Sequence, residues 1–161
     1  MSSVLFLVDH TAGKISKASG ELATYAKSIG ESVAVIFADN ADAIASQLNT
    51  FPVDKIITVS GEWDKYGAPA IAEGLSQLIA AKSPAAVFIT STATGKEIAA
   101  RVSVITGSGI ITDAVSVDKD LITTQSVFGG STTVHSTVTK GVPVITVRAN
   151  SIEATITTSS A

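Results

Sequence analysis

The chain contains no cysteine and little charge. The absence of cysteine among 161 residues excludes disulfides, thiolate metal sites and cysteine nucleophiles. Charged residues make up 16% of the chain, whereas about 25% is typical of soluble domains, and the mean hydropathy is +0.42. A chain of this length fits a single domain. Its composition predicts either an unusually well buried interior or an apolar surface that a partner covers.

Basic clusters and long apolar runs are missing as well. With a net charge of −3 and no basic cluster, the sequence favours neither nucleic acid nor an anionic membrane as a partner. No apolar run approaches the roughly 18 residues of a membrane span, so direct membrane insertion is not expected. The run Val4–Val8 is too short for a signal peptide and has no basic residue before it. We therefore expect a cytoplasmic protein.

Short apolar runs alternate with amphipathic segments over the first two thirds of the chain. Continuous branched and aromatic runs are typical of buried parallel strands, and apolar spacings of three and four residues are typical of helices. Strands are predicted at 4–8, 33–38, 55–59 and 86–90. Helices are predicted with Ser16 as a cap, with Asp39 or Asn40 as a cap, over 68–81, and around Ile98, Val102 and Ile105. This alternation predicts a mainly parallel sheet covered by helices on both faces, a three-layer αβα fold.

The final third has a different composition. From Asp113 the sequence is rich in threonine and valine, has turn residues at close intervals and shows no helical period. Three or four strands joined by tight turns are therefore predicted, and Pro143 lies at the start of the last one, where a missing N–H donor is tolerated. We expect antiparallel strands in this third of one domain, residues 1–155, followed by a polar tail or the start of a linker, 156–161.

The stretch TSTATGKEIAARV, residues 90–102, is the candidate for a phosphate-binding loop. A Walker-type loop needs glycine five residues before its Gly-Lys pair and serine or threonine directly after the pair. Those positions hold Thr90 and Glu97, so the motif fails. A looser anion site at the start of the predicted helix stays open, as does a role in capping and packing alone. The tendency of ligands to bind at the carboxyl ends of parallel strands supports the anion site.

Other chemical candidates are weak. His10 follows the first strand and would lie at the same edge of the sheet, whereas His135 falls in a Thr/Val segment and is expected to be an ordinary surface residue. Two such distant histidines without cysteines form no metal set, so no metal is expected. The serines form no G-x-S-x-G motif, and GSG at 107–109 fits a helix end better than a dinucleotide-binding turn. We nominate no catalytic residue.

Four segments match one known family in their order and spacing. VLFLVDHTAGKISKASGELATYAKSIGESVAVIFA joins a strand, a Gly-Lys turn and a helix that follows a serine. The 90–102 loop contributes Thr92, Gly95, Lys96, Ile98, Ala100 and Arg101. GSGIITDAVSV carries Gly109 and Asp113, and SVFGGSTTVHSTVTKGVPVITVRANSIEA closes a strand on Val-Arg. Over residues 3–155 the chain resembles the N-terminal domain, domain I, of the electron transfer flavoprotein α subunit, although the position of Ala100 is commonly proline there.

The resemblance implies an adenine-nucleotide α-hydrolase-like fold and a part in electron transport rather than an enzymatic activity. In that family FAD is held mainly by a separate C-terminal domain, with help from the β subunit, so this chain is expected to lack the FAD-binding domain and to bind no cofactor. AMP is expected only in the β subunit. The intact heterodimer would carry electrons from dehydrogenases, such as those of fatty acid β-oxidation, to a membrane oxidoreductase.

Five residues follow from these considerations as site candidates. Lys96 and Arg101 are candidates for contacts with neighbouring domains. The crevice candidates are His10, Thr92, Gly95 and Lys96.

A stand-alone adenine-nucleotide-binding module of the stress-protein type is the alternative. Its site would be the crevice beside Asp9-His10, Asp39-Asn40 and the 90–96 loop. A hydrolase on the same fold is a third possibility, for which no nucleophile–base pair can be named.

Overall fold

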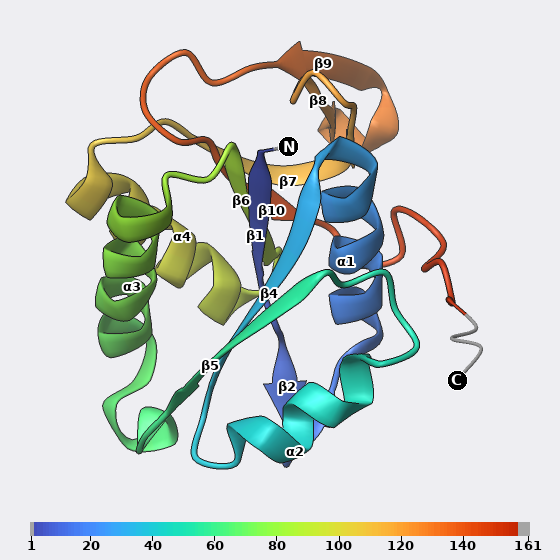
Figure 1. Ribbon diagram of the computed structural model, residues 1–161. Coiled ribbons are helices and arrows are strands. Elements are labelled where there is room, and N and C mark those ends of the chain that lie inside the picture. The colour runs from blue at the N-terminus through green and yellow to red at the C-terminus, as the bar shows by residue number, and fades with distance from the viewer. Residues whose placement is uncertain (1, 158–161) are drawn as a thin grey trace.

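The structure is a computed structural model that describes residues 2–157 (Figure 1). Its strands are β1 (Ser3–Leu7), β2 (His10–Thr11), β3 (Lys14–Ile15), β4 (Glu31–Ala38), β5 (Lys55–Ser60), β6 (Ala86–Thr90), β7 (Ile110–Val117), β8 (Thr123–Val127), β9 (Thr132–Ser136) and β10 (Val144–Val147). Its helices are α1 (Lys17–Ile29), α2 (Ala41–Ala45), α3 (Trp63–Lys82) and α4 (Ala93–Thr106), with 3₁₀ turns η1 (Ser46–Leu48) and η2 (Phe128–Gly130).

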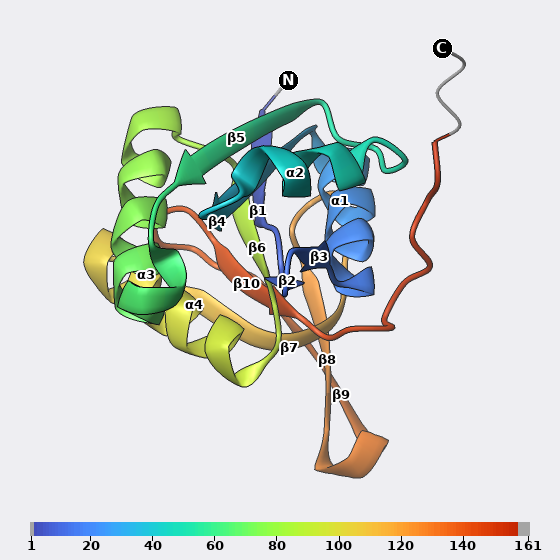
Figure 2. The same cartoon turned by 90° about the horizontal axis from the view of Figure 1, so that it is seen from below.

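The predicted three-layer αβα fold with a mainly parallel sheet is confirmed. Eight strands form the middle layer in the order β5-β4-β1-β6-β10-β7-β8-β9, and α1 and α3 lie on opposite sides of it (Figures 1 and 2). β1 pairs in parallel with β4 on one side and with β6 on the other. The strand order therefore reverses between β1 and β6, which in open α/β sheets leaves a crevice at the carboxyl ends of the two strands.

Alternation along the buried strands builds a separate core on each face of the sheet. On one face Phe6 and Phe88 pack with Leu22 of α1. On the other face Leu5 packs with Leu75 of α3, together with residues of α4. All five side chains are at most 1% exposed. Burial of each such side chain stabilises the fold by about 1.5–3 kcal/mol, which is why the strands read as continuous apolar runs.

Three details of the helices differ from the expectation. α3 begins at Trp63 rather than Ala68, because a first turn is joined to the main helix across a kink at Gly67, whose φ is 69°. Ser16 and Asn40 occupy N-cap positions, but neither side chain makes a capping hydrogen bond. Ile105 was expected on the buried face of α4; it is 56% exposed and lines an open hollow beside the end of α3.

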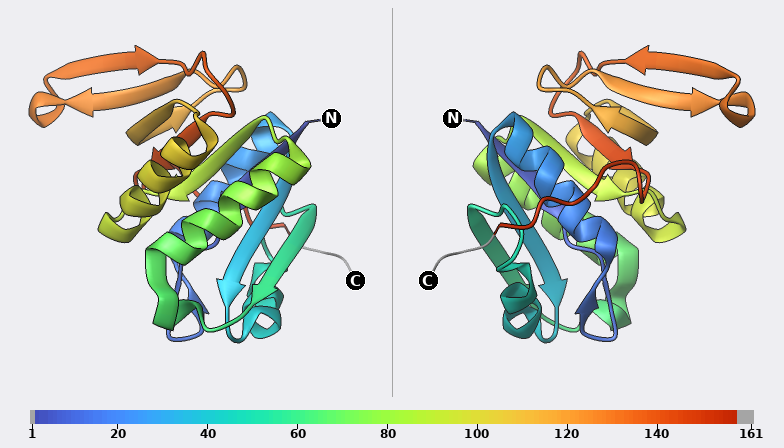
Figure 3. Two further views of the ribbon diagram at one scale, coloured as in Figure 1. Left: turned by 90° about the vertical axis from the view of Figure 1, so that its left-hand side faces the viewer. Right: turned by 90° about the vertical axis from the view of Figure 1, so that its right-hand side faces the viewer.

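The final third combines a hairpin with one inserted parallel strand. β7, β8 and β9 pair in antiparallel fashion, as predicted, and the β8–β9 hairpin projects from the body of the domain (Figure 3). β10 departs from the expectation because it lies between β6 and β7 and runs parallel to both. Residues 150–157 then follow α1 (Figure 3). Of the predicted polar tail, residues 158–161 lie outside the described part of the chain.

Candidate functional site

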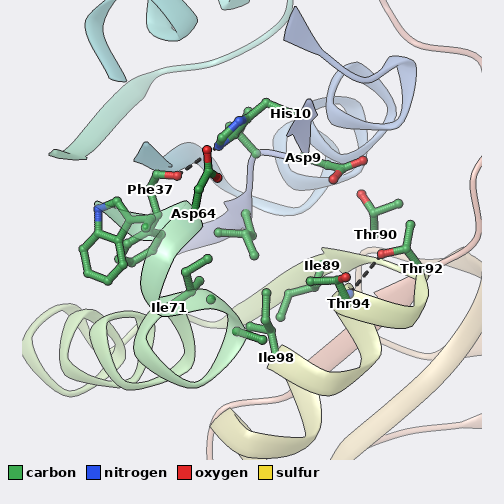
Figure 4. A pocket seen from close by; sticks show the side chains of 16 residues that line it. Asp9, His10, Phe37, Asp64, Ile71, Ile89, Thr90, Thr92, Thr94 and Ile98 are labelled. Carbon is green, nitrogen blue, oxygen red and sulfur yellow. Dashed lines mark hydrogen bonds between the residues drawn. The ribbon is translucent and has the colours of Figure 1, made fainter. Parts of the chain in front are cut away.

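A crevice of about 250 Å³ opens where β1 and β6 end (Figure 4). Its floor is apolar and is formed by the buried side chains of Leu7, Ile89 and Ile98. This is the position that the reversal of strand order predicts for a ligand. The volume lies just below the roughly 300–1,000 Å³ of typical small-molecule sites, so a small ligand would fit and a dinucleotide would not.

One wall of the crevice is aromatic. Trp63, at the start of α3, packs edge-on against Phe37 with ring centroids 4.9 Å apart, and its indole N–H donates to the Val59 carbonyl at 2.8 Å. These contacts fix the indole from two directions. Asp64 follows it and points toward His10 across the opening (Figure 4).

The β1 side of the crevice carries Asp9 and His10. His10 Nε2 lies 2.9 Å from the Phe37 carbonyl oxygen; since a carbonyl only accepts, Nε2 carries the proton and Nδ1 is left for another partner. The fully buried Ser19 hydroxyl bridges the backbone of Asp9, accepting from its N–H at 2.9 Å and donating to its carbonyl at 3.0 Å. The start of α1 therefore holds this loop in place.

The opposite side is the start of α4. The Thr92 hydroxyl accepts the Gly95 N–H at 2.9 Å and caps the helix, which leaves the N–H groups of Ala93 and Thr94 without intrahelical acceptors. A Cβ on Gly95 would lie 1.9 Å from the Thr90 carbonyl oxygen. Close packing thus explains the glycine of the Gly-Lys pair without any phosphate. The Thr90 hydroxyl, in contrast, is buried without a hydrogen-bond partner.

The five site candidates from the sequence separate into three places. His10, Thr92 and Gly95 line the crevice together. Lys96 turns away from it: its Nζ lies 3.0 Å from Asp113 Oδ2 of β7. Arg101 lies on the outer face of α4, where its guanidinium lies 3.2 Å from Glu97, one turn earlier.

A second polar cluster surrounds Asp113. The Ser91 hydroxyl donates to Asp113 Oδ1, Lys96 contacts Oδ2, and Arg148 Nε lies 3.9 Å from Oδ1. The Ser91 hydrogen bond, and then the two cations, hold the pKa of the Asp113 carboxyl below its ordinary value. Reasoning from spacing did not bring these residues together, because they come from β6, α4, β7 and the end of β10. The family resemblance, which includes Lys96, Asp113 and the Val-Arg pair at the end of β10, was the signal for them.

Two other expectations concern metals and membranes. Residues 2–157 contain no group of three or more His, Asp or Glu side chains placed to hold a metal ion. His135 lies in the exposed β9 strand, where Nδ1 contacts the Thr124 hydroxyl at 3.2 Å. Among the described helices, none combines the length and the apolar character that crossing a membrane requires.

The fold and crevice define an α/β domain of the doubly wound type, with a ligand-sized opening at its switch point. The model of the electron transfer flavoprotein domain family matches residues 4–161. The chain belongs to this family, and it corresponds to the N-terminal domain of the α subunit, as the four segments had indicated.

Individual relatives agree with this assignment. The chain is 38% identical over 157 residues to electron transfer flavoprotein subunit alpha of Mycobacterium tuberculosis, covering 96% of this chain and 49% of the relative. The same name belongs to a Mycobacterium leprae relative with the same identity and coverage. It also belongs to a Bacillus subtilis relative that is 26% identical over 129 residues, or 78% of this chain and 40% of the relative. The chain therefore spans about half the length of the curated relatives it matches.

Proposed function

We propose that this domain is a structural platform within an electron transfer flavoprotein, and that the flavin is bound by other parts of the protein. This proposal is supported by the match of the family model to residues 4–161 and by relatives that are about twice as long as this chain. The redox chemistry of such a protein belongs to its cofactor, while the polypeptide supplies position and electrostatics. FAD would be held mainly by a C-terminal domain and the β subunit. Electrons would pass from dehydrogenases to a membrane oxidoreductase, in the cytoplasm of a bacterium.

The outer face of α4 is the proposed contact with the β subunit. Val104 is 82% exposed and Ile105 is 56% exposed, and Arg101 lies on the same helix beside them. Neighbouring exposed aliphatic side chains are typical of surfaces that a partner covers, and charged residues are scarce in this chain. The segment 150–157 runs along α1, in the opposite layer, and so does not cover α4 (Figure 3).

Co-purification tests the platform role. A full-length α subunit lacking residues 1–161 should no longer form a stable heterodimer with its β subunit, and the purified 161-residue chain should be colourless. Normal assembly of the shortened subunit, or a tightly held flavin in the short chain, would refute the proposal.

Surface variants test the proposed face of α4. Val104→Glu with Ile105→Glu should weaken heterodimer formation, because burying two carboxylates at an interface without partners is unfavourable. Ala43→Glu, on the exposed part of α2, is the matched control and should assemble normally. Equal assembly of both variants would place the interface elsewhere while leaving the platform role intact.

Binding of a small adenine nucleotide in the crevice is the second candidate. It is favoured by the position of the opening at the switch point and by His10, Thr92 and Gly95 around it. Trp63, the single tryptophan, lines the wall and reports occupancy through its fluorescence. Titration with AMP and with ATP should change the Trp63 emission saturably. No change in emission and no heat at millimolar nucleotide would eliminate this candidate.

A further inference from the structure

We propose that Lys96, Asp113 and Arg148 form a binding site for a phosphate group beside the first turn of α4. This site is distinct from the crevice. Gly95 and Ile98 face the crevice, whereas Lys96 leaves the same turn of α4 on the side of β7, where it meets Asp113. The crevice and this ion cluster therefore flank the start of one helix.

The charge balance of this cluster is unlike that of the other ion pairs among residues 2–157. Four contacts join one cation to one carboxylate each: Lys27–Asp54, Lys55–Glu31, Lys65–Glu62 and Arg101–Glu97. Asp113 alone contacts two cations, Lys96 and Arg148. The cluster therefore carries a net charge of +1 in a chain whose overall charge is −3. An excess positive charge at one fixed place attracts an anion.

Irregular backbone positions the carboxylate between the two cations. β7 contributes Thr112 and Asp113 between the pairs Ile111–Ile145 and Ala114–Val147, where β10 contributes a single residue. Asp113 has a φ of 58°, in the left-handed region that non-glycine residues rarely adopt. Such bulges often redirect a side chain next to a functional site. Here the bulge directs Asp113 away from the sheet ladder and toward α4.

Two hydroxyl groups hold Asp113 in this position. The Thr146 hydroxyl, fully buried on β10, accepts the Asp113 N–H at 3.0 Å and donates to the Ser91 hydroxyl at 3.1 Å. The Ser91 hydroxyl in turn donates to Asp113 Oδ1. The carboxylate is thus held through both its backbone and its side chain. The carboxylate keeps the two cations on the same side of α4, while its own negative charge opposes the binding of an anion.

Both cations retain donors for a ligand. The side chains of Lys96 and Arg148 are 44% and 48% exposed. The 3.9 Å between Arg148 Nε and Asp113 is longer than the roughly 2.7–2.9 Å of a charge-assisted hydrogen bond, so the guanidinium fork is not consumed by this contact. A fork of N–H donors matches the oxygens of a phosphate group, and lysine adds a point charge. The positive end of α4, which is 14 residues long, adds to the attraction.

Titration of the 161-residue chain with inorganic phosphate tests the site. Two-dimensional ¹H–¹⁵N spectra recorded at constant ionic strength should show saturable shifts of the Ser91–Lys96 and Arg148 amides. Lys96→Met and Arg148→Met should each weaken phosphate binding roughly three- to fivefold, the size expected of a half-exposed charged contact. Arg101→Met removes an equally exposed cation from a one-to-one pair and should leave phosphate binding unchanged.

Asp113→Asn gives a result that a purely structural ion network would not produce. Loss of the carboxylate frees both cations, so phosphate should bind more tightly, not more weakly. If this variant fails to fold, as judged by circular dichroism, the methionine variants still decide the question. Shifts that chloride reproduces, or equal behaviour of the Arg148 and Arg101 variants, would overturn the proposal.

Titration with AMP distinguishes free phosphate from a nucleotide phosphate as the ligand. It also distinguishes binding at this site from binding in the crevice. AMP that shifts the Arg148 amide and competes with inorganic phosphate would identify a nucleotide phosphate as the group bound. Phosphate binding that AMP does not displace would restrict the site to free phosphate. AMP that changes only the Trp63 emission would support the crevice alone, and it would count against this site as a nucleotide contact.

Discussion

Gly95 packs against Thr90 so closely that an added Cβ would lie 1.9 Å from the Thr90 carbonyl oxygen. The neighbour is backbone at the end of a central strand and cannot move aside as a flexible side chain can. Gly95→Ala should therefore force α4 away from β6 and lower the free energy of unfolding by about 1–3 kcal/mol. Urea unfolding followed by circular dichroism measures the change.

A control on the same turn separates packing from electrostatics. Glu97→Ala removes only the exposed contact with Arg101 and should change the free energy of unfolding by less than about 0.5 kcal/mol. If Gly95→Ala proved as harmless as Glu97→Ala, close packing would not explain the Gly-Lys pair, and a ligand role for the loop would gain weight.

The layers of the fold were predictable because the signals are local. The strand predicted at 86–90 coincides with β6, since a continuous apolar run bounded by Pro84 and a hydroxyl-rich loop leaves few alternatives. The end of α4 at Gly107 was likewise readable, because its φ of 67° suits glycine. Such features depend on a few consecutive residues and not on the remainder of the chain.

Long-range relationships were not predictable in the same way. The sequence of β10 indicates a strand but not its place between β6 and β7, which depends on pairing with residues 33 to 57 positions away along the chain. The exposure of Ile105 depends on an open hollow between α4 and the end of α3, which apolar spacing along α4 alone does not reveal. The crevice residues could be grouped because strand ends share one edge, whereas the bulge at Asp113 left no local signal.

The Ser19 hydroxyl offers a test of how the crevice is supported. Ser19 is fully buried and satisfies both the N–H and the carbonyl of Asp9. Ser19→Ala leaves the Asp9 N–H without this partner, while the Asp9 carbonyl keeps its hydrogen bond from the Ser16 N–H at 2.8 Å. We therefore expect a loss of about 1–3 kcal/mol in the free energy of unfolding and shifted Asp9 and His10 amides. Ser46→Ala is the control: Ser46 is exposed, its hydroxyl donates to the Ala43 carbonyl of the preceding helix α2, and the variant should leave these amides unchanged. Unchanged His10 amides in Ser19→Ala would contradict the supporting role.

The hydrogen bonds of the Asp54 carboxylate predict that the free energy of unfolding depends on pH. Lys27 donates to the Asp54 carboxylate at 2.8 Å, and the Ser32 N–H donates at 2.9 Å. These hydrogen bonds lower the pKa of Asp54 in the folded state, and the bond from Lys27 has the larger effect. Because the folded pKa lies below the unfolded value of about 3.9, the group stabilises the fold above that pH. The contribution is lost as the pH falls through the folded pKa.

Asp54→Asn isolates this contribution. The side chain is 33% exposed, so the variant should lose about 1 kcal/mol or less near pH 7. The difference between the two proteins in the free energy of unfolding should shrink as the pH falls from about 4 toward 2. Urea unfolding at several pH values measures it. A difference that stays constant over this range, or grows toward low pH, would contradict the assignment.

Glu21 is the clearest buried polar residue without a partner among residues 2–157. It is 2% exposed, and neither carboxylate oxygen has a hydrogen-bond partner. Lys17 and Tyr25 lie one turn away on the same side of α1 and contact Asn150 and Ser151, so Glu21 faces the segment that follows β10. Burial of a polar group without a partner is unfavourable by about 1–3 kcal/mol. Glu21→Met keeps a similar volume and removes this penalty, so we expect the free energy of unfolding to rise by a comparable amount.

Glu73→Met is the matched control, because Glu73 is an exposed glutamate on α3 and should change the free energy of unfolding by less than about 0.5 kcal/mol. Urea unfolding of both variants at pH 7 makes the comparison, and both residues have similar helix propensity. A loss of stability in Glu21→Met would mean that the carboxylate makes a favourable contact with ordered water or an ion, since only a bonded carboxylate is destabilising to remove. The sign of this one change therefore decides whether the space between α1 and the segment after β10 is dry or contains a polar partner.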